Sequence, residues 1–200
     1  MDGFSALVAV LAGLVTITGG IVAVWRYLRV RQRRESLQVS APRLTDLNAG
    51  GHHHEALILS EQAIRSDPQD ALAYVNKGWA LNALGKHQKA LQACEQAILL
   101  SLNAPIIRAA ACRHKAWALN GLGNHYQALQ ACNDAIRLQP GVAANAYTYV
   151  TKSGALNGLG RPQEALQVCE EALRLYPEDD NLKAAIAKQK DAALKALRRH

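Results

Sequence analysis

The amino-acid sequence predicts an all-α protein with an N-terminal transmembrane helix, a solenoid of about four helix-turn-helix repeats and a C-terminal capping helix. Three observations predict this class. A run of 22 residues near the N-terminus has no charged residue, small residues recur in one register through four segments, and an amphipathic segment ends the chain. The predicted boundaries are 1–3 for a short N-terminus, 4–25 for the span, 26–41 for a basic linker, 42–178 for the repeats and 179–200 for the cap.

The first predicted element is a membrane span over residues 4–25, which read FSALVAVLAGLVTITGGIVAVW. A helix of this length rises about 33 Å, which is enough to cross a bilayer core. A secretory signal peptide would need a positive segment before the apolar run, and only Asp2 precedes it. We therefore expect an uncleaved anchor, with a soluble hydrophobic helix as the alternative.

Aromatic and basic residues follow the span and are expected at the membrane interface: Trp25, Arg26, Tyr27, Arg29, Arg31, Arg33 and Arg34. The positive-inside rule then predicts a single-pass protein with its N-terminus outside and its repeats in the cytoplasm, at an inner, plasma or thylakoid membrane. Small residues recur at four-residue steps within the span, at Ser5, Ala9 and Gly13. Such a row allows a second transmembrane helix to pack closely, although it is also ordinary membrane composition.

The repeats are aligned on four glycines, each at the turn between two helices: Gly51, Gly85, Gly123 and Gly160. They are 34, 38 and 37 residues apart, and apolar residues at three- and four-residue steps flank each of them. A glycine reaches positive φ without steric cost, so it is suited to end the first helix. The predicted repeats cover about 42–68, 71–102, 105–140 and 143–177.

Alanines stand five and twelve residues after every turn glycine, where helices are expected to approach closely: Ala56, Ala90, Ala128 and Ala165, then Ala63, Ala97, Ala135 and Ala172. Proline follows at the seventeenth position in three copies, at Pro68, Pro140 and Pro177. This pattern resembles the tetratricopeptide repeat (TPR) over roughly two thirds of the chain. The sequence of residues 76–98, NKGWALNALGKHQKALQACEQAI, is similar to repeats common in bacteria, cyanobacteria included. The resemblance implies a right-handed superhelix that binds proteins.

The repeats depart from the family pattern in two ways. The usual large aromatic nine residues after the turn is replaced by a small residue, at Ser60, Cys94, Cys132 and Cys169, which predicts an underfilled core. About one extra helical turn is inserted around residues 103–107. The cysteines show no CxxC spacing and are expected to be buried small thiols, although a pair between Cys94 and Cys112 stays open.

The sequence predicts no metal site, no cofactor and no enzymatic activity. The run His52, His53 and His54 suggests zinc, but His53 stands two residues after its turn glycine, as do His87 and His125, so it is a turn residue of the array. No Ser-His-Asp set, glycine-rich phosphate loop or isolated carboxylate pair is present.

The candidate partner-binding residues lie on the first helices, which line the concave groove in the family that the chain resembles. Asparagine stands three residues before every turn glycine, at Asn48, Asn82, Asn120 and Asn157. Trp79 and Trp117 lie one helical step earlier, and Arg113 is assigned to the same groove. Asparagine amides bind an extended peptide backbone in some members of that family. The alternative is that each asparagine satisfies backbone groups near its own helix end.

The basic residues eight before each glycine have two interpretations. Arg43, Lys77, Lys115 and Lys152 are candidates for a positive rim beside the groove, or their stems cover apolar surface between helices. The net charge of +7 does not predict nucleic-acid binding, because residues 35–178 hold 12 basic and 12 acidic side chains. The excess lies after the span and in residues 179–200, whose apolar positions Leu182, Ile186, Ala193, Leu194 and Leu197 predict the capping helix.

The sequence thus predicts a membrane-anchored TPR scaffold that binds a polypeptide partner on the cytoplasmic face. The alternative is a small structural subunit or assembly factor, held in a larger membrane complex by its span, in the way that anchored repeat proteins assist photosystem assembly.

Overall fold

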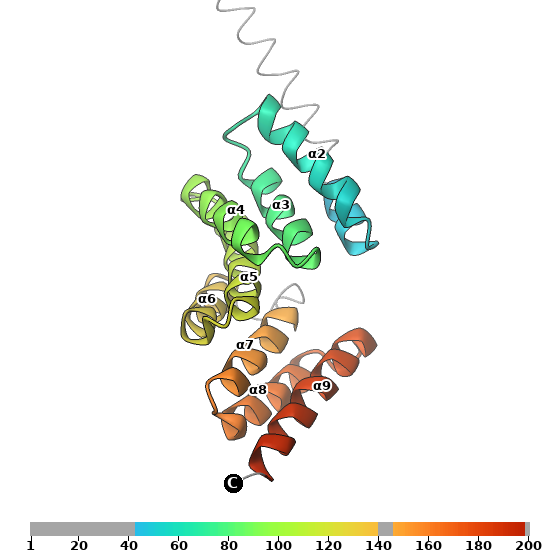
Figure 1. The fold of residues 1–200 in the computed structure, drawn as a ribbon, viewed down its shortest axis with the longest axis vertical. Coiled ribbons are helices and arrows are strands. Elements are labelled where there is room, and N and C mark those ends of the chain that lie inside the picture. Colours follow the sequence, from blue (N-terminus) through green and yellow to red (C-terminus); the bar gives the residue numbers. More distant parts are fainter. Residues whose placement is uncertain (1–42, 140–145, 199–200) are drawn as a thin grey trace, which may run out of the picture. The chain divides into compact units, whose positions relative to one another are not determined.

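Helices joined by short turns make up residues 43–139 and 146–198, which are the part of the chain that the computed structural model describes (Figure 1). The predicted span at 4–25, the linker at 26–41 and the interface residues from Trp25 to Arg34 lie outside the described residues. Among the residues described, none of the helices combines the length and the apolar character that a membrane crossing needs.

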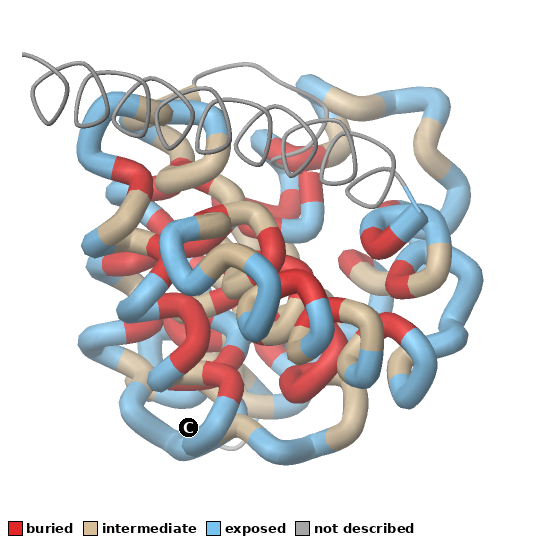
Figure 2. The backbone as a smooth tube through the Cα atoms, turned by 90° about the horizontal axis from the view of Figure 1, so that it is seen from above, coloured by how far each residue is buried: buried red, intermediate tan, exposed pale blue. Residues whose placement is uncertain are grey.

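The helices follow one another as pairs. After a helical stretch at residues 43–49, the order is α2 (His53–Ser66), α3 (Ala71–Ala83), α4 (His87–Leu100), α5 (Pro105–Gly121), α6 (His125–Leu138), α7 (Ala146–Gly158), α8 (Pro162–Leu175) and α9 (Asp180–Leu197). Each helix packs on the next, and the first helices α3, α5 and α7 also pack on one another in that order. Buried residues alternate with exposed ones along these helices (Figure 2). The described residues therefore form a TPR-like solenoid.

The four turn glycines have positive φ, at 81° for Gly51, 70° for Gly85, 78° for Gly123 and 68° for Gly160. Around Gly85, the glycine N–H donates to Asn82 O at 3.0 Å and Lys86 N–H donates to Leu81 O at 2.8 Å. This pair of bonds satisfies the last carbonyls of the first helix. The prediction that glycine ends the first helix is confirmed at all four positions.

The predicted alanines are buried where the helices meet. The four at the fifth position after the turn, Ala56, Ala90, Ala128 and Ala165, are 0% exposed. Three of the four at the twelfth position are also 0% exposed, and Ala63 is 9% exposed. A methyl side chain lets the helix axes approach closely, so these residues fix the spacing of the array.

The predicted underfilled core is wrong at Cys94. A Cβ on Gly78 would lie 2.6 Å from Cys94 Sγ. The first helix therefore lies close enough to occupy the space that a larger residue in place of Cys94 would fill. All four cysteines are buried free thiols, as expected, and the open pairing of Cys94 with Cys112 is not formed. Burial raises the pKa of Cys94 and of Cys132 to about 12.

The inserted turn lengthens α5 at its N-terminus. This helix has 17 residues, whereas α3 and α7 have 13 each. Pro105 stands in its first turn, where proline is tolerated because the amide there has no helical acceptor. The extra turn predicted around residues 103–107 is therefore found as additional helix at the start of α5.

The last helix, α9, packs on α7 and α8, in the place that the first helix of a fifth repeat would take. The Asp179 side chain accepts a bond from Leu182 N–H at 2.9 Å and so caps its N-terminus. Leu182 and Ile186 are buried as expected, but Leu194 is 43% exposed. The spacing placed both Ala193 and Leu194 on the packed face, and of the two only Ala193 is buried.

Candidate partner-binding groove

Three of the four asparagines that stand three residues before a turn glycine bond to the backbone of the neighbouring repeat or of the cap. Asn48 Nδ2 donates to Asn76 O at 3.1 Å, and Asn82 Nδ2 donates to His114 O at 2.8 Å. At the end of the array, Asn157 Nδ2 donates to Gln189 O of α9 at 3.0 Å. In each case the acceptor lies on the next first helix or on the cap, so the amide ties one repeat to its successor.

A histidine two residues after the glycine completes three of these junctions. The Nδ1 to Oδ1 distances are 3.4 Å for His53 and Asn48, 3.2 Å for His87 and Asn82, and 2.7 Å for His125 and Asn120. A Cβ on Gly121 would lie 2.6 Å from the His87 ring, so this ring packs directly on the next first helix. We call each such pair an Asn–His bridge.

The fourth junction has no Asn–His bridge because Pro162 stands in the histidine register. The Oδ1 atom of Asn157 is buried there without a hydrogen-bond partner in the described part of the chain. An unpartnered buried oxygen is costly, so this junction is held less firmly than the other three.

Asn48 and Asn82, which the sequence assigned to partner binding, are each 2% exposed. This burial and the bridges favour the structural alternative. The backbone that Asn82 satisfies belongs to the adjacent repeat, however, rather than to its own helix end. The partner-binding role of the four asparagines stays a prediction, and the geometry does not support it.

The other predicted groove residues, Trp79, Arg113 and Trp117, come together in one cleft of about 550 Å³. Its walls are the first helices α3, α5 and α7, and the remaining lining residues are Ala49, His114, Tyr147, Val150 and Thr151. Trp117 is 37% exposed and Tyr147 is 49% exposed. The cleft therefore offers aromatic surface that the described residues do not cover.

His114 forms the floor of this cleft between the two tryptophans. Its ring stacks on Trp79 with a centroid distance of 5.3 Å and an interplanar angle of 20°, and it lies 6.4 Å from the Trp117 ring. The side chain is 4% exposed. The cleft floor is therefore a packed aromatic layer.

Arg113 determines the tautomer of His114. Arg113 Nη2 lies 3.3 Å from His114 Nε2, and a guanidinium can only donate, so Nε2 accepts and the proton is on Nδ1. The Nδ1 atom is buried and has no hydrogen-bond partner among the described residues. Burial, and then the charge of Arg113, lower the pKa of His114 well below 6.5. The imidazole is therefore neutral at pH 7 and holds an unused donor.

The sequence missed His114, Tyr147, Val150 and Thr151. His114 and Thr151 stand nine residues before their glycines, three before the register of the tryptophans, so they share the same helix face. Extending the tryptophan face by one more helical step would have found His114 and Thr151. They were overlooked because their residue types differ from copy to copy.

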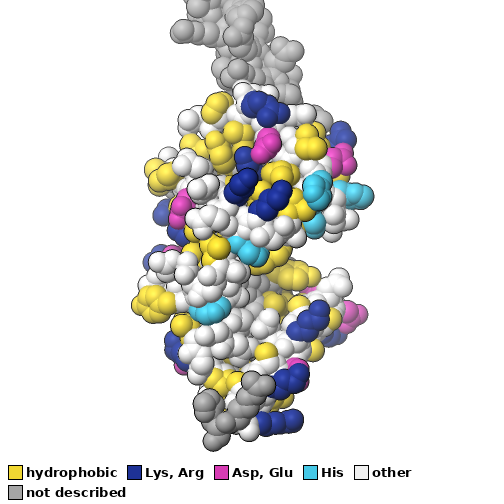
Figure 3. All heavy atoms as spheres, in the orientation of Figure 1, with side chains coloured by type: hydrophobic (Ala, Val, Ile, Leu, Met, Phe, Trp, Pro, Cys, Tyr) yellow, Lys and Arg dark blue, Asp and Glu magenta, His cyan; other side chains and the backbone are white. Residues whose placement is uncertain are grey.

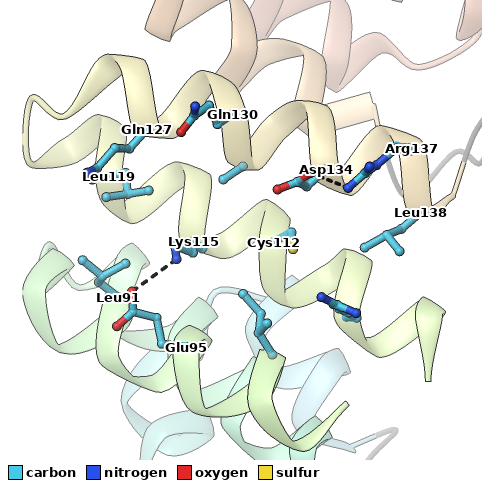
Figure 4. A pocket seen from close by; sticks show the side chains of 13 residues that line it. Leu91, Glu95, Cys112, Lys115, Leu119, Gln127, Gln130, Asp134, Arg137 and Leu138 are labelled. Atoms are coloured by element: carbon cyan, nitrogen blue, oxygen red, sulfur yellow. Dashed lines mark hydrogen bonds and ion pairs between the residues drawn. The ribbon is translucent and has the colours of Figure 1, made fainter. Parts of the chain in front are cut away.

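A different kind of hollow lies between successive second helices. Two furrows of about 480 Å³ each have linings that match in register, with a Lys–Glu pair in both. Lys77 bonds to Glu61 at 3.1 Å and Lys115 to Glu95 at 3.2 Å. Figure 4 shows the second furrow, with Lys115 directed toward Glu95. Because the furrow recurs, we interpret it as a consequence of repeat packing.

The lining of the cleft includes none of the four residues suggested for a positive rim, Arg43, Lys77, Lys115 and Lys152. Lys77 and Lys115 line the furrows, while Arg43 pairs with Glu55 at 3.4 Å on the surface. Basic and acidic side chains are interspersed on the face that Figure 3 shows. Within residues 43–139 and 146–198, no group of three or more His, Cys, Asp or Glu side chains is placed to hold a metal ion.

Comparison with known proteins agrees with this geometry. Tetratricopeptide-repeat family models match residues 59–92 and 146–179. The chain contains tetratricopeptide repeats. Curated protein sequences gave no match.

Solved structures resemble the array. A putative kinesin light chain of Podospora anserina with nearly identical TPR-like repeats is 16% identical, with a TM-score of 0.61 over 82% of this chain and 88% of that one. MamA from Desulfovibrio magneticus RS-1, from residue 41 to its end, is 19% identical, with a TM-score of 0.54 over 80% and 92%. At such low identity these similarities establish the TPR fold alone.

Proposed function

We propose that this TPR chain is a non-catalytic scaffold that binds an extended segment of a polypeptide partner in the cleft lined by Trp79, Trp117 and Tyr147. The observation that carries the proposal is that Trp79, Trp117 and Tyr147 meet at one junction of the described array, whereas the furrows and the Asn–His bridges recur. Exposed tryptophan and tyrosine are the side chains that most often dominate binding energy at interfaces.

The chemistry of the cleft specifies its occupant. The described residues that line it include one cation, Arg113, and none of them is acidic. Apolar side chains of the partner would pack on the aromatic walls, and a carboxylate would lie near Arg113. The segment that fits is apolar with one acidic residue.

The membrane anchor belongs to the same proposal and is supported by the sequence alone. We infer that residues 4–25 hold the chain in an inner, plasma or thylakoid membrane, with the repeats on the cytoplasmic side. Cleavage of the segment around Ser66 and Asp67 by protease added from the cytoplasmic side would agree with this topology. Cleavage only from the opposite side would contradict it.

The cleft is tested by photo-crosslinking in cells. A photoreactive amino acid in place of Tyr147 is expected to capture a polypeptide, while the same group in place of Tyr126 is not. Tyr126 is the matched control because it is 63% exposed and lies outside the cleft. Trp117→Ala should weaken capture by roughly thirty-fold or more in affinity.

Equal capture at both positions, or capture at Tyr147 that Trp117→Ala leaves unchanged, would contradict a binding role for the cleft. Deleting residues 1–34 separates this proposal from the structural alternative. Capture that survives the deletion supports the cleft, whereas capture that requires the span supports a subunit held in a membrane complex.

A further inference from the structure

Three large aliphatic side chains protrude together where α4 ends and α5 begins. Leu99 is 63% exposed, Leu102 is 68% exposed and Ile106 is 67% exposed. They lie within eight residues of one another, across one turn. We call them the α4–α5 apolar patch. The described residues do not bury this patch, and neither the cleft nor the furrows use it as lining.

The register shows that the patch is specific to this junction. Fourteen residues after the turn glycine, the other three repeats carry arginine, at Arg65, Arg137 and Arg174, and this repeat carries Leu99. At the seventeenth position they carry proline, and this repeat carries Leu102. Ile106 lies in the inserted turn. Packing within the repeat therefore does not require these three aliphatic residues.

The loop between the helices is held by its own bonds. Ser101 is 1% exposed and its hydroxyl donates to Ile98 O at 3.3 Å. Ala104 N–H donates to Ser101 O at 3.0 Å, and Arg108 N–H donates to Ala104 O at 3.0 Å. With Ser101 buried and the turn closed in this way, Leu102 is fixed on the outside of the loop.

We propose that the α4–α5 apolar patch inserts into the surface of a membrane that contains anionic lipid. Three side chains provide too little area for a stable protein interface, which needs roughly 800 Å² from each partner. A lipid surface demands no matching shape, and a protruding aliphatic loop enters the headgroup region readily.

The charges near the patch favour anionic headgroups. Arg108 lies two residues after Ile106, on the added turn of α5, where its half-buried side chain also lines the furrow with Asp134. Arg65 and Arg137 are exposed at the register of Leu99 in the repeats on either side, although Arg137 also bonds to Asp134 at 2.8 Å. Basic side chains beside an inserted apolar loop attract phosphate groups of the lipid. This inference does not depend on the cleft or its partner.

The test uses the full chain carrying Asn103→Cys, labelled with an environment-sensitive fluorophore. The native thiols are buried, so the thiol introduced at position 103 is expected to react selectively. The labelled protein is reconstituted in vesicles of phosphatidylcholine with phosphatidylglycerol, in vesicles of phosphatidylcholine alone, and in detergent. A label at Lys86→Cys, in the turn at the opposite end of α4, is the control.

In the phosphatidylglycerol vesicles, emission of the label at position 103 is expected to shift to shorter wavelength and to be quenched by spin-labelled lipid. The label at position 86 should do neither. Leu99→Arg gives this repeat the residue that the other three carry, so the fold should be kept, and it should reduce the quenched fraction about ten-fold or more. Ile58→Arg, at a residue that is 56% exposed elsewhere on the array, should leave the quenching unchanged.

Two outcomes would overturn the inference. The first is that the patch does not respond to lipid. This would appear as equal emission of the label at position 103 in all three preparations, or as quenching that Leu99→Arg does not reduce. The second is a shift in detergent that grows with protein concentration and is lost in Leu99→Arg, because a second copy of the chain would then be the occupant of the patch.

Discussion

The asparagine register and the aromatic cleft occupy the same first helices but differ in how often they occur. Asparagine stands before the turn in all four repeats, and each amide that crosses a junction ends on the backbone of the next helix. Trp79, His114 and Trp117 come together once, at the junction of α3 and α5. The difference teaches that a residue present in every copy serves packing, which every copy needs. A residue found in one copy is free to serve a partner.

The furrows and the α4–α5 apolar patch extend the same comparison. Two furrows among the described residues have matching Lys–Glu pairs, and they belong to the packing of the second helices. The patch occurs once, where Leu99 replaces the arginine of the other repeats. Changes at recurring positions should therefore reduce stability, and changes at unique positions should reduce binding.

The largest loss of stability is expected from overpacking a recurring alanine. Ala90→Leu or Ala128→Leu should each lower the free energy of unfolding by about 1 to 3 kcal/mol, because both residues are 0% exposed between helices. Ala184→Leu on the exposed face of α9 is the control and should change little. Urea denaturation measures all three, and unchanged midpoints for Ala90→Leu would show that this register does not set the helix spacing.

Removing an Asn–His bridge should cost about as much or somewhat less. Asn82→Ala loses two hydrogen bonds at about 0.5 to 1.5 kcal/mol each, to His114 O and His87 Nδ1. Asn157→Ala should cost less, since Asn157 Oδ1 has no partner to lose among the described residues. Equal midpoints for the two variants in thermal denaturation would contradict a stabilising role for the histidines.

The smallest effect is a dependence of stability on pH that comes from His114. Its pKa is lowered by burial in the folded protein, so below pH 6.5 the unfolded chain takes up a proton that the folded protein does not. Stability is therefore full above pH 6.5 and falls as the pH decreases from there, by at most about 1.4 kcal/mol per pH unit for one such group. His114→Phe keeps the stacking on Trp79 and should remove this part of the slope. The same loss in both proteins between pH 7.5 and 5.5 would exclude His114 as its source.

Features that follow from the repeat register were predictable from the sequence. The turn glycines, the buried alanines and the position of the extra turn are fixed by spacing, and the structure confirms them. The two tryptophans were assigned correctly to one face because both stand six residues before a turn glycine. Register places a side chain on a helix, but it does not say what the side chain touches.

The direction of the asparagines could not be predicted for that reason. Asn82 stands at the junction of its own turn and the next repeat, and its partners His87 and His114 lie 5 and 32 residues away. Only the geometry of the turn and the distance between repeats decide whether the asparagine side chain faces the groove or bonds to the next repeat. His114 was missed because nothing in its register repeats, although its burial between two tryptophans makes it the centre of the cleft.

One measurement tests the comparison most directly: thermal midpoint and partner affinity on the same samples of Asn82→Ala and Trp117→Ala. Asn82→Ala is expected to melt earlier and to bind with normal affinity while folded. Trp117→Ala, at a side chain that is 37% exposed, is expected to melt normally and to bind roughly thirty-fold more weakly. The opposite assignment, with normal melting and weak binding for Asn82→Ala and early melting with normal binding for Trp117→Ala, would contradict the account.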